Sequence, residues 1–183
     1  LPDADWHRRV VGRSLRSATQ RSIDRGQALI RAAGVVLERS GGEDITVQEV
    51  ADEAGQSLRT LYQYFESKDD LLLAVFEESM RIYATLIRDA IADLDDHLER
   101  LGGAMVAATS MAQFSEEGID RGLTRLRLRL AESSPDLVGR AQEAITSLVR
   151  ALVAEAATAG RVEVDDPDAA AFLLLSLNAA FIT

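Results

Sequence analysis

The sequence ITVQEVADEAGQSLRTLYQYFESK, residues 45–68, contains the signals for two short helices and the start of a third. Thr46, followed three residues later by Glu49, has the spacing of a capping box, which begins a helix. Gly55 can adopt the positive φ of a tight turn, and Ser57 is a second helix-capping residue. Helix, glycine turn and helix in this order predict a helix-turn-helix, a motif that places its second helix in the major groove of DNA.

Apolar residues at helical spacing predict the helices around this motif. From about residue 22 to the Gly41-Gly42 pair they recur at i, i+1, i+4, i+7 and i+8, which is one face of a helix. The members of this face are Leu29, Ile30, Ala33, Val36 and Leu37. The residues of the motif expected to point inward are Val47, Val50, Ala51, Ala54, Leu61 and Phe65. After the motif, Ser67 with Asp70 three positions on predicts another capping box and another helix.

The positive charge of the chain is concentrated near its start. Residues 1–40 hold eight arginines and four acidic residues, a net charge of +4. Because the net charge of the chain is −10, the other 143 residues carry a net charge of −14. DNA would attract the first part and repel the second. Residues 1–21 show no strong helical stripe. They are expected to form either a mobile or weakly helical tail, or a basic arm that contacts phosphates or the minor groove.

These signals occur together in an order that resembles a known family. The residues that carry the resemblance are Leu29-Ile30-Arg31-Ala32-Ala33, Thr46-Val47, Val50-Ala51, Ala54-Gly55 and the run TLYQYFESKDDLL, residues 60–72. They resemble the N-terminal domain of the TetR family of transcriptional regulators. The resemblance does not extend over the C-terminal two-thirds of the chain. One residue departs from it: the family usually places a small aliphatic residue after the turn glycine, where this chain has Gln56, expected to loosen the turn or to expose a polar group towards DNA.

The resemblance implies an all-α fold. It consists of an N-terminal three-helix DNA-binding domain with a helix-turn-helix, followed by a larger helical ligand-binding and dimerisation domain. The expected division is a basic arm over residues 1–21, the helix-turn-helix domain over 22–68 and the effector-binding and dimerisation domain over 69–183.

The resemblance and the geometry of the motif together assign candidate DNA contacts. The set is Thr46, Ser57, Leu58, Arg59, Thr60, Tyr62, Gln63, Tyr64 and Lys68. Arg59 is expected to read a base, since its forked donors match guanine O6 and N7, and otherwise to contact a phosphate or water. Leu58 is a candidate for a thymine methyl group. The two threonines, Tyr62 and Lys68 carry over from the family motif as backbone contacts. Ser57 and Gln63 can bond to either part of DNA, and Tyr64 either packs or contacts phosphate.

Apolar spacing predicts further helices after residue 69. These are one long helix to about residue 95, one from about 101, one over 123–130 in preference to a strand, one from Ser134-Pro135 to Gly160, and a last one from Asp166-Pro167. The last contains FLLLSLNAAFI, which is apolar nearly all round. It is therefore either the central core helix or part of a subunit interface. The resemblance implies a homodimer formed by the last two helices, of which only one is evident, so a further C-terminal helix is expected.

The resemblance also implies a small-molecule effector bound among these later helices. Candidate pocket residues are Met80, Tyr83, Met105, Thr109, Met111 and Phe114, because methionine and aromatic side chains adapt to apolar ligands, although the same residues also fit an ordinary core. No cofactor is expected. The chain has no cysteine, and His7 and His97 are far apart, so a metal site is not expected. Nucleotide-binding and catalytic motifs are absent, which disfavours an enzyme. No apolar run approaches the ~18 residues that span a bilayer, so the expected location is cytoplasmic.

The hypothesis from the sequence is a sequence-specific DNA-binding transcriptional regulator. It would bind a palindromic operator as a homodimer, probe double-stranded DNA with two heads, and act as a repressor released by a small molecule. Two alternatives stay open. One is a small-apolar-molecule binding protein with a vestigial DNA-binding head. The other is an architectural DNA-binding protein, which would usually be basic throughout, unlike the acidic later part of this chain.

Overall fold

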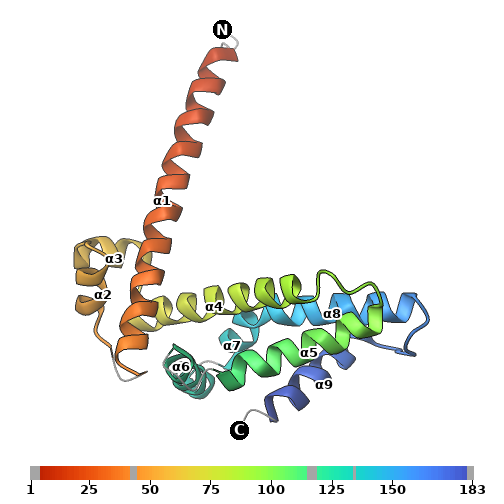
Figure 1. Ribbon diagram of the computed structural model, residues 1–183. Helices are drawn as coiled ribbons and strands as arrows, with labels where there is room; N and C mark the ends of the chain where they lie inside the picture. The colour runs from red at the N-terminus through yellow and green to blue at the C-terminus, as the bar shows by residue number, and fades with distance from the viewer. Residues whose placement is uncertain (1–4, 42–44, 115–118, 134, 181–183) are drawn as a thin grey trace.

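The computed structural model describes residues 5–41, 45–114, 119–133 and 135–180, and over these residues it is all α-helical (Figure 1). The helices are α1 (Asp5–Arg39), α2 (Val47–Glu53), α3 (Leu58–Tyr64), α4 (Lys68–Ala90), α5 (His97–Phe114), α6 (Ile119–Ser133), α7 (Pro135–Ala141), α8 (Glu143–Thr158) and α9 (Pro167–Ala180). Helices α2 and α3 lie beside the C-terminal half of α1, and α4 leads from there into a body that contains α5, α8 and α9. The predicted all-α fold, with an N-terminal three-helix unit and a larger helical body, is confirmed.

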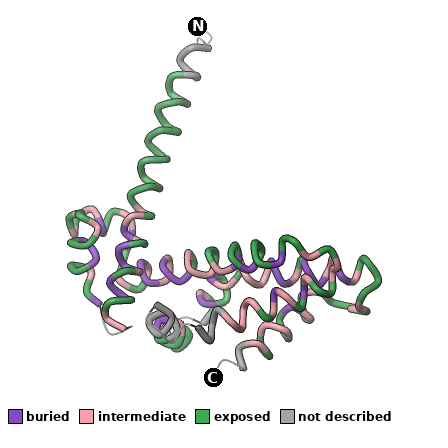
Figure 2. The backbone as a smooth tube through the Cα atoms, viewed as in Figure 1, coloured by how far each residue is buried: buried purple, intermediate pink, exposed green. Residues whose placement is uncertain are grey.

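Helix α1 is longer than the sequence pattern indicates. It runs unbroken for 35 residues, so the expectation of a tail followed by a helix from about residue 22 is wrong. Its C-terminal half is packed, with Leu29 and Ala33 fully buried. Over residues 10–25 every residue except Gly12 is exposed (Figure 2). A helix whose first turns are already formed by packing can continue without a buried face, because each added residue avoids the cost of nucleation. The N-terminal half of α1 is therefore helical although its sequence has no apolar stripe.

The buried side chains form two clusters, and the first extends beyond the N-terminal three-helix unit of α1, α2 and α3, which we call the head. It joins the predicted inward faces of α1, α2 and α3 to the start of α4 and to buried residues of α6 and α7. Those α6 and α7 residues are Leu126, Leu130, Val138 and Ala141. A hydrogen bond reinforces the contact, since the Arg125 side chain donates to the carbonyl of Gly41 over 3.1 Å. The sequence did not indicate that α6 and α7 pack with the head.

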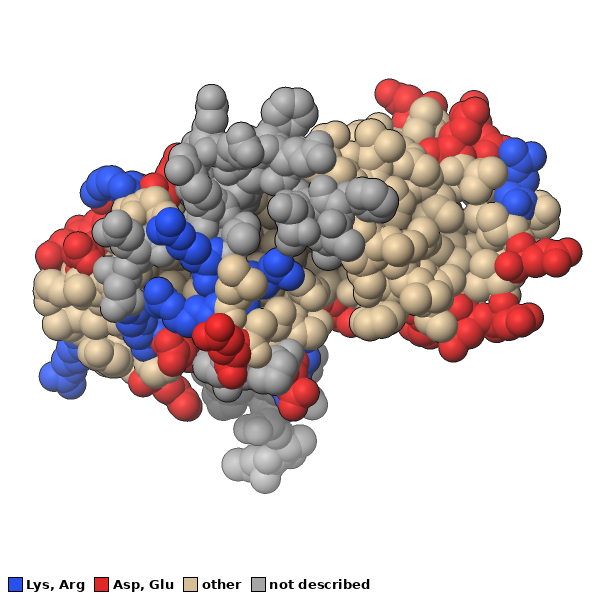
Figure 3. Space-filling view, turned by 90° about the horizontal axis from the view of Figure 1, so that it is seen from below, with Lys and Arg blue, Asp and Glu red and all other residues tan. Residues whose placement is uncertain are grey.

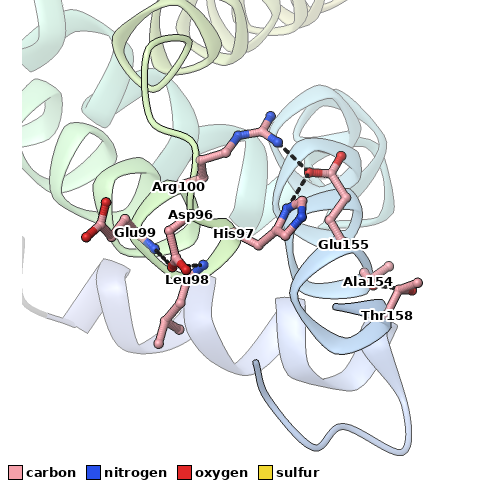
Figure 4. A network of polar contacts seen from close by, with 8 residues as sticks. All are labelled: Asp96, His97, Leu98, Glu99, Arg100, Ala154, Glu155 and Thr158. Atoms are coloured by element: carbon pink, nitrogen blue, oxygen red, sulfur yellow. Dashed lines mark hydrogen bonds and ion pairs between the residues drawn. The ribbon is translucent and has the colours of Figure 1, made fainter. Parts of the chain in front are cut away.

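The second cluster holds the rest of the body together. It joins the C-terminal half of α4 to α5, α8 and α9, with Ile87, Leu152 and Ala171 among its buried members. At one edge of this cluster, Glu155 of α8 accepts from Arg100 over 2.8 Å and lies 3.8 Å from Nδ1 of His97 (Figure 4). These contacts attach the start of α5 to α8.

The division between the clusters breaks one predicted helix in two. The expected helix from residue 135 to 160 is instead α7 and α8, separated at Gln142, which makes no side-chain cap. Val138 lies in the first cluster and Leu148 in the second. One straight helix would have to serve both packing surfaces. The expected helix over 123–130 is confirmed as part of α6, where Leu126 and Leu130 are buried and Leu128 is exposed.

Helix starts follow the predicted capping residues with two differences. Ser67 accepts from the Asp70 N–H over 3.1 Å as expected, but the Asp70 carboxylate accepts from Glu66 N–H over 2.9 Å, so the reciprocal half of the capping box is displaced by one residue. Helix α5 begins at His97, earlier than predicted, because the Asp96 carboxylate accepts from the N–H groups of the next turn (Figure 4). The hydrogen bond from the Glu99 N–H is the main cause that lowers the pKa of Asp96.

Helix α9 is covered on one face. Ala171 is fully buried, whereas Phe172, Leu173 and Leu177 are exposed by 68%, 59% and 59%. The central-core alternative for this helix is therefore wrong. Among the described helices, none is both long enough and apolar enough to cross a membrane. The same residues contain no cluster of acidic, histidine or cysteine side chains that could hold a metal ion.

Candidate nucleic-acid interface

The turn between α2 and α3 is fixed by backbone hydrogen bonds. Gly55 has a φ of +62°, which is the left-handed conformation that a helix end of this kind requires. The N–H of Gln56 donates to the carbonyl of Ala51 over 2.8 Å, and that of Gly55 donates to Asp52 over 3.1 Å. This pair of bonds is the Schellman motif. It ends α2 and sets the direction in which α3 leaves the turn.

Helix α3 is held from its inner side and capped at its start. Leu61 is fully buried and Phe65 is 8% exposed, so the helix cannot rotate without opening the first cluster. The Ser57 hydroxyl accepts from the Thr60 N–H over 3.1 Å and lies 2.9 Å from the Thr60 hydroxyl. The predicted N-cap is confirmed. Both hydroxyl groups are already oriented by each other.

The outer side of α3 presents three of the candidate residues to solvent. Arg59, Tyr62 and Gln63 are exposed, with Tyr62 at 53%. Arg59 is the only cation that α3 contains, and it makes no ion pair with another described residue. Its guanidinium group is thus available to an external acceptor.

The other α3 candidates are half-buried. Leu58 and Tyr64 pack against the first cluster, and a ring carbon of Tyr64 lies 3.7 Å from the position that a Cβ on Gly26 would occupy. This contact shows that Tyr64 packs against α1, the first of its two predicted roles. Leu58 exposes only part of its side chain, so a contact with a thymine methyl would use that part.

Two candidates outside α3 come together at the start of α2. Thr46 forms the predicted capping box: its hydroxyl accepts from the Glu49 N–H over 3.2 Å, and its own N–H donates to the Glu49 carboxylate over 2.7 Å. Lys68, half-buried in the first turn of α4, is close enough for its charge to act on Glu49. Thr46 and Lys68 therefore border the same surface. The sequence separates them by more than twenty positions.

The capping box makes a prediction about pH. The pKa of Glu49 is lowered from 4.5, mainly by the Thr46 N–H, then by the Thr46 hydroxyl, with a smaller effect of the Lys68 charge. A lowered pKa means that this carboxylate stabilises the fold above pH 4.5, and that the contribution is lost as the pH falls through the folded-state value. We expect an NMR titration of the Glu49 carboxyl carbon to show a midpoint below 4.5. In Thr46→Val the midpoint should rise part of the way, since the backbone N–H remains. A midpoint at or above 4.5 in the parent would contradict this assignment.

Charge is distributed unevenly over the surface. Seen from below, most of the visible Lys and Arg side chains lie on the half of the molecule that holds the head, interspersed with Asp and Glu, whereas Asp and Glu predominate at the far end of the body (Figure 3). Along the sequence, residues 1–40 carry an excess of arginine and the remainder of the chain is acidic. DNA is therefore favoured at the head end and repelled by the far end of the body.

The effector candidates are divided between the two clusters. Met80 and Tyr83 are half-buried against the first cluster, and Met105 against the second. Thr109 donates to the Met105 carbonyl over 2.8 Å and accepts from Asn178 over 2.6 Å. Asn178 was missed because its helix was interpreted as almost wholly apolar. Met111 and Phe114 belong to α5, but their side chains lie outside the described residues.

An open depression of about 610 Å³ lies elsewhere on the body. It is lined by His97, by residues on one side of α8, namely Ala151, Ala154, Glu155 and Thr158, and by Ala159 at the C-cap of that helix. None of the four described effector candidates lines it. The predicted pocket and this depression are different places, and the prediction of an effector pocket among the candidates stays a prediction.

Comparison with known proteins agrees with the geometry of the head. Residues 29–75 match the sequence model of a family described as bacterial regulatory proteins, tetR family. Over these residues the chain is similar to the TetR family. The matched segment begins in the packed half of α1, contains α2 and α3, and ends in the first turns of α4.

Two curated TetR-family relatives show how far the sequence likeness extends. The chain is 34% identical over 100 residues to the HTH-type transcriptional regulator BetI of Brucella canis, covering 55% of this chain and 50% of BetI. It is 35% identical over 94 residues to the HTH-type transcriptional activator FasR of Mycolicibacterium smegmatis, covering 51% of this chain and 42% of FasR. The chain thus spans about half the length of the curated relatives that it matches.

The fold is similar over a longer part of the chain. The crystal structure of the transcriptional regulator FadR from Bacillus subtilis, in complex with stearoyl-CoA, superposes with a TM-score of 0.62. The similarity covers 86% of this chain and 84% of FadR at 17% identity. The arrangement of helices that the chain shares with FadR therefore continues beyond the head.

Gln56 is the departure from the family pattern, and its side chain does not loosen the turn. Its backbone N–H completes the Schellman motif, while its side-chain amide lies 3.5 Å from the carbonyl of Arg25 in α1. The side chain therefore turns back onto α1, and the expectation of a looser turn or a polar group presented to DNA is wrong. Its Oε1 atom is buried and has no hydrogen-bond partner among the described residues.

Proposed function

We propose that the chain is a sequence-specific DNA-binding transcriptional regulator whose recognition helix is α3. The observation that carries this is the outer face of α3. It presents an arginine that has no ion-pair partner among the described residues beside Tyr62 and Gln63, on a helix locked by a fully buried Leu61. Such a rigid, solvated donor face matches the acceptors of the major groove. Both curated relatives are named as HTH-type transcriptional proteins, which supports the proposal.

We further propose the roles of the candidate contacts. Arg59 reads a base. Tyr62 and Gln63 contact DNA from the exposed side of α3, while Thr46 and Lys68 contact the backbone from the edge formed by α2 and α4. Ser57 and Thr60 contribute hydroxyl groups at the start of α3. Phosphate contacts of this kind fix the position of the helix, and base contacts select the sequence.

The functional unit is proposed to be a homodimer. One recognition helix contacts too few base pairs to select a site in a genome, and a two-fold dimer on a palindrome solves this problem. The exposed Phe172, Leu173 and Leu177 of α9 offer an apolar face for a second copy. Half-site centres would then lie ~34–36 Å apart or at a multiple of that distance.

Release by a small molecule completes the proposal. The structure of FadR, similar in fold, holds stearoyl-CoA, so fatty acyl-CoA is a rational first probe for this chain. A ligand can release DNA only if it binds one conformation of the dimer more tightly than the other. We propose repression as the mode of action. The reason is that a bulky dimer on an operator blocks transcription, although FasR is named an activator. The proposed function is regulatory rather than enzymatic, and is exercised in the cytoplasm.

The first experiment is selection of bound duplexes from random DNA, repeated in the presence of stearoyl-CoA. We expect enrichment of a palindromic sequence, and weaker binding when an effective ligand is added. No enrichment over bulk DNA would overturn the proposed function and favour the alternative of a small-molecule binding protein with an inactive head.

The second experiment tests Arg59. Replacement by alanine should weaken binding to the selected duplex by about 1–3 kcal/mol and relax selection at one base pair of each half-site. Arg88→Ala is the matched control, because Arg88 is exposed on α4 away from the head. Both variants are measured by fluorescence anisotropy on the selected duplex and on duplexes changed at single positions. Unchanged affinity and selectivity in Arg59→Ala would contradict the proposal that Arg59 reads a base.

A further inference from the structure

The first turns of α1 form a helical arm that packs against nothing in the described chain. We define the α1 extension as residues 10–25, which are exposed apart from Gly12 (Figure 2). At 1.5 Å per residue it is about 24 Å long. It is continuous with the packed half of α1, so its direction relative to the head is set by the buried contacts of Leu29 and Ala33.

The α1 extension carries positive charge that forms no ion pair with the described residues. Arg13, Arg16, Arg21 and Arg25 are exposed, and none of them makes an ion pair with another described residue. The one acidic side chain of the extension is Asp24, which accepts a hydrogen bond from Gln20 over 2.9 Å. At about 100° per residue, the four arginines fall within one half of the helix circumference. They form a cationic side that is open to a polyanion.

The position of the α1 extension places this charge beside the recognition helix. The Gln56 side chain reaches the Arg25 carbonyl, and Tyr64 lies against Gly26, so both ends of α3 meet α1 at the base of the extension. From that level the extension continues away from α4, α5, α8 and α9 (Figure 1). The acidic body therefore lies at one end of α1 and the extension at the other. Helix α3 and the α1 extension therefore both lie on the side of the molecule away from the acidic body (Figure 1).

We propose that the α1 extension binds phosphates of the DNA that flanks each half-site, through Arg13, Arg16 and Arg21. This rests on the proposed function, since it needs α3 in a major groove. A length of about 24 Å corresponds to about seven base pairs at 3.4 Å each, a distance over which a duplex offers many phosphates. The contacts add affinity without reading sequence.

A second copy of the chain fits the α1 extension less well than DNA does. Pairing of two helices needs an apolar stripe sustained over three to four heptads. The stripe opposite the arginines consists of Val11, Leu15 and Ala18 and is followed by the polar Ser22. It spans less than two heptads. Charge also opposes the pairing, because two copies would bring the unneutralised arginines of both helices together.

The test compares three full-length proteins on one duplex. The duplex is the sequence that the parent protein enriches from random DNA, prepared once with about 15 flanking base pairs on each side and once trimmed to the half-sites. The test variant carries Arg13→Gln, Arg16→Gln and Arg21→Gln. The control carries Arg88→Gln, Arg127→Gln and Arg140→Gln, which remove the same charge from α4, α6 and α7. Affinity is measured between 50 and 200 mM salt.

The expected result is a smaller salt dependence of the test variant on the long duplex. Each lost phosphate contact lowers the steepness of log K against log salt by about 0.9, so the six contacts of a dimer, three from each protomer, lower it by about 5.4. The parent then loses roughly 1,800-fold more affinity than the test variant between the two salt concentrations. The control keeps the parent slope. On the trimmed duplex the test variant and the parent have equal slopes. Arg→Lys at the three positions keeps the parent slope on both duplexes.

Two results would overturn this inference while leaving the proposed function intact. One is a parent-like slope of the test variant on the long duplex. The other is a combination of two observations: the double variant Val11→Gln, Leu15→Gln changes the oligomeric state, and the arginine substitutions do not affect DNA binding. Together they would show that the extension serves self-association. If the parent enriches no duplex at all, the proposed function and this inference fail together.

Discussion

Leu61→Ala is expected to lower the free energy of unfolding of the head by about 2–5 kcal/mol and, as a result, to weaken binding to every duplex. Leu61 is fully buried, with 0% of its surface accessible to water. Truncation leaves a cavity at the point where α3 meets the first cluster, and the capped turn before it prevents α3 from moving in to fill the space. Chemical denaturation followed by circular dichroism measures the loss.

The adjacent residue supplies the control for this prediction. Tyr62 is exposed by 53%, so Tyr62→Ala should change the free energy of unfolding by no more than about 0.5 kcal/mol. It should nevertheless weaken DNA binding, because the side chain belongs to the proposed interface. Equal denaturation midpoints for Leu61→Ala and the parent would show that α3 is not held in the way described.

The second large effect is expected at α9. Replacing both Leu173 and Leu177 by glutamate should convert the proposed homodimer to a monomer at micromolar concentration. Leaving an unpaired charge in a buried interface costs about 3–5 kcal/mol, which corresponds to a loss of dimer affinity of more than about 100-fold. Monomers should also lose the selected palindrome, because one head contacts only one half-site. Sedimentation velocity and DNA binding are the two measurements.

A matched substitution on another helix distinguishes the loss of a dimer interface from a general effect of adding a charge to an exposed apolar position. Leu128 of α6 is exposed by 54%, comparable to Leu173 and Leu177 at 59%, and Leu128→Glu should leave the oligomeric state unchanged. Circular dichroism of the α9 variant checks that the helices remain formed. A parent protein that sediments as a monomer, or a glutamate variant that remains a dimer, would exclude α9 as the interface.

Local chemistry explains why the head was predictable from the sequence. Thr46 with Glu49, Gly55, and Ser57 each determine their own turn through bonds to residues no more than four or five positions away. The inward face of α3 follows from helical spacing, so the exposure of Arg59, Tyr62 and Gln63 was also predictable. Which of these side chains contacts a base depends on DNA, and the predicted contacts stay predictions.

Features that depend on distant contacts were missed. The α1 extension has no apolar stripe, because the packing that supports its helix lies in another part of α1. The break at Gln142 exists because Val138 and Leu148 belong to different clusters, a fact that no spacing within the segment records. The bond from Asn178 to Thr109 joins residues 69 positions apart in the chain. The Gln56 side chain likewise turns towards Arg25, 31 positions earlier.

Helix α4 contributes Phe76 to the first cluster and Ala84 to the second, and none of the seven residues between them is buried. The two clusters share no buried side chain. Substitutions that are far apart and have no common neighbours act almost additively. A chain built in this way can therefore accumulate changes around one set of side chains, and with them a different ligand preference, while the energetic support of the recognition helix is left untouched. Because no buried side chain of α4 lies between Phe76 and Ala84, substitutions of buried residues in one cluster are expected to act almost additively with those in the other.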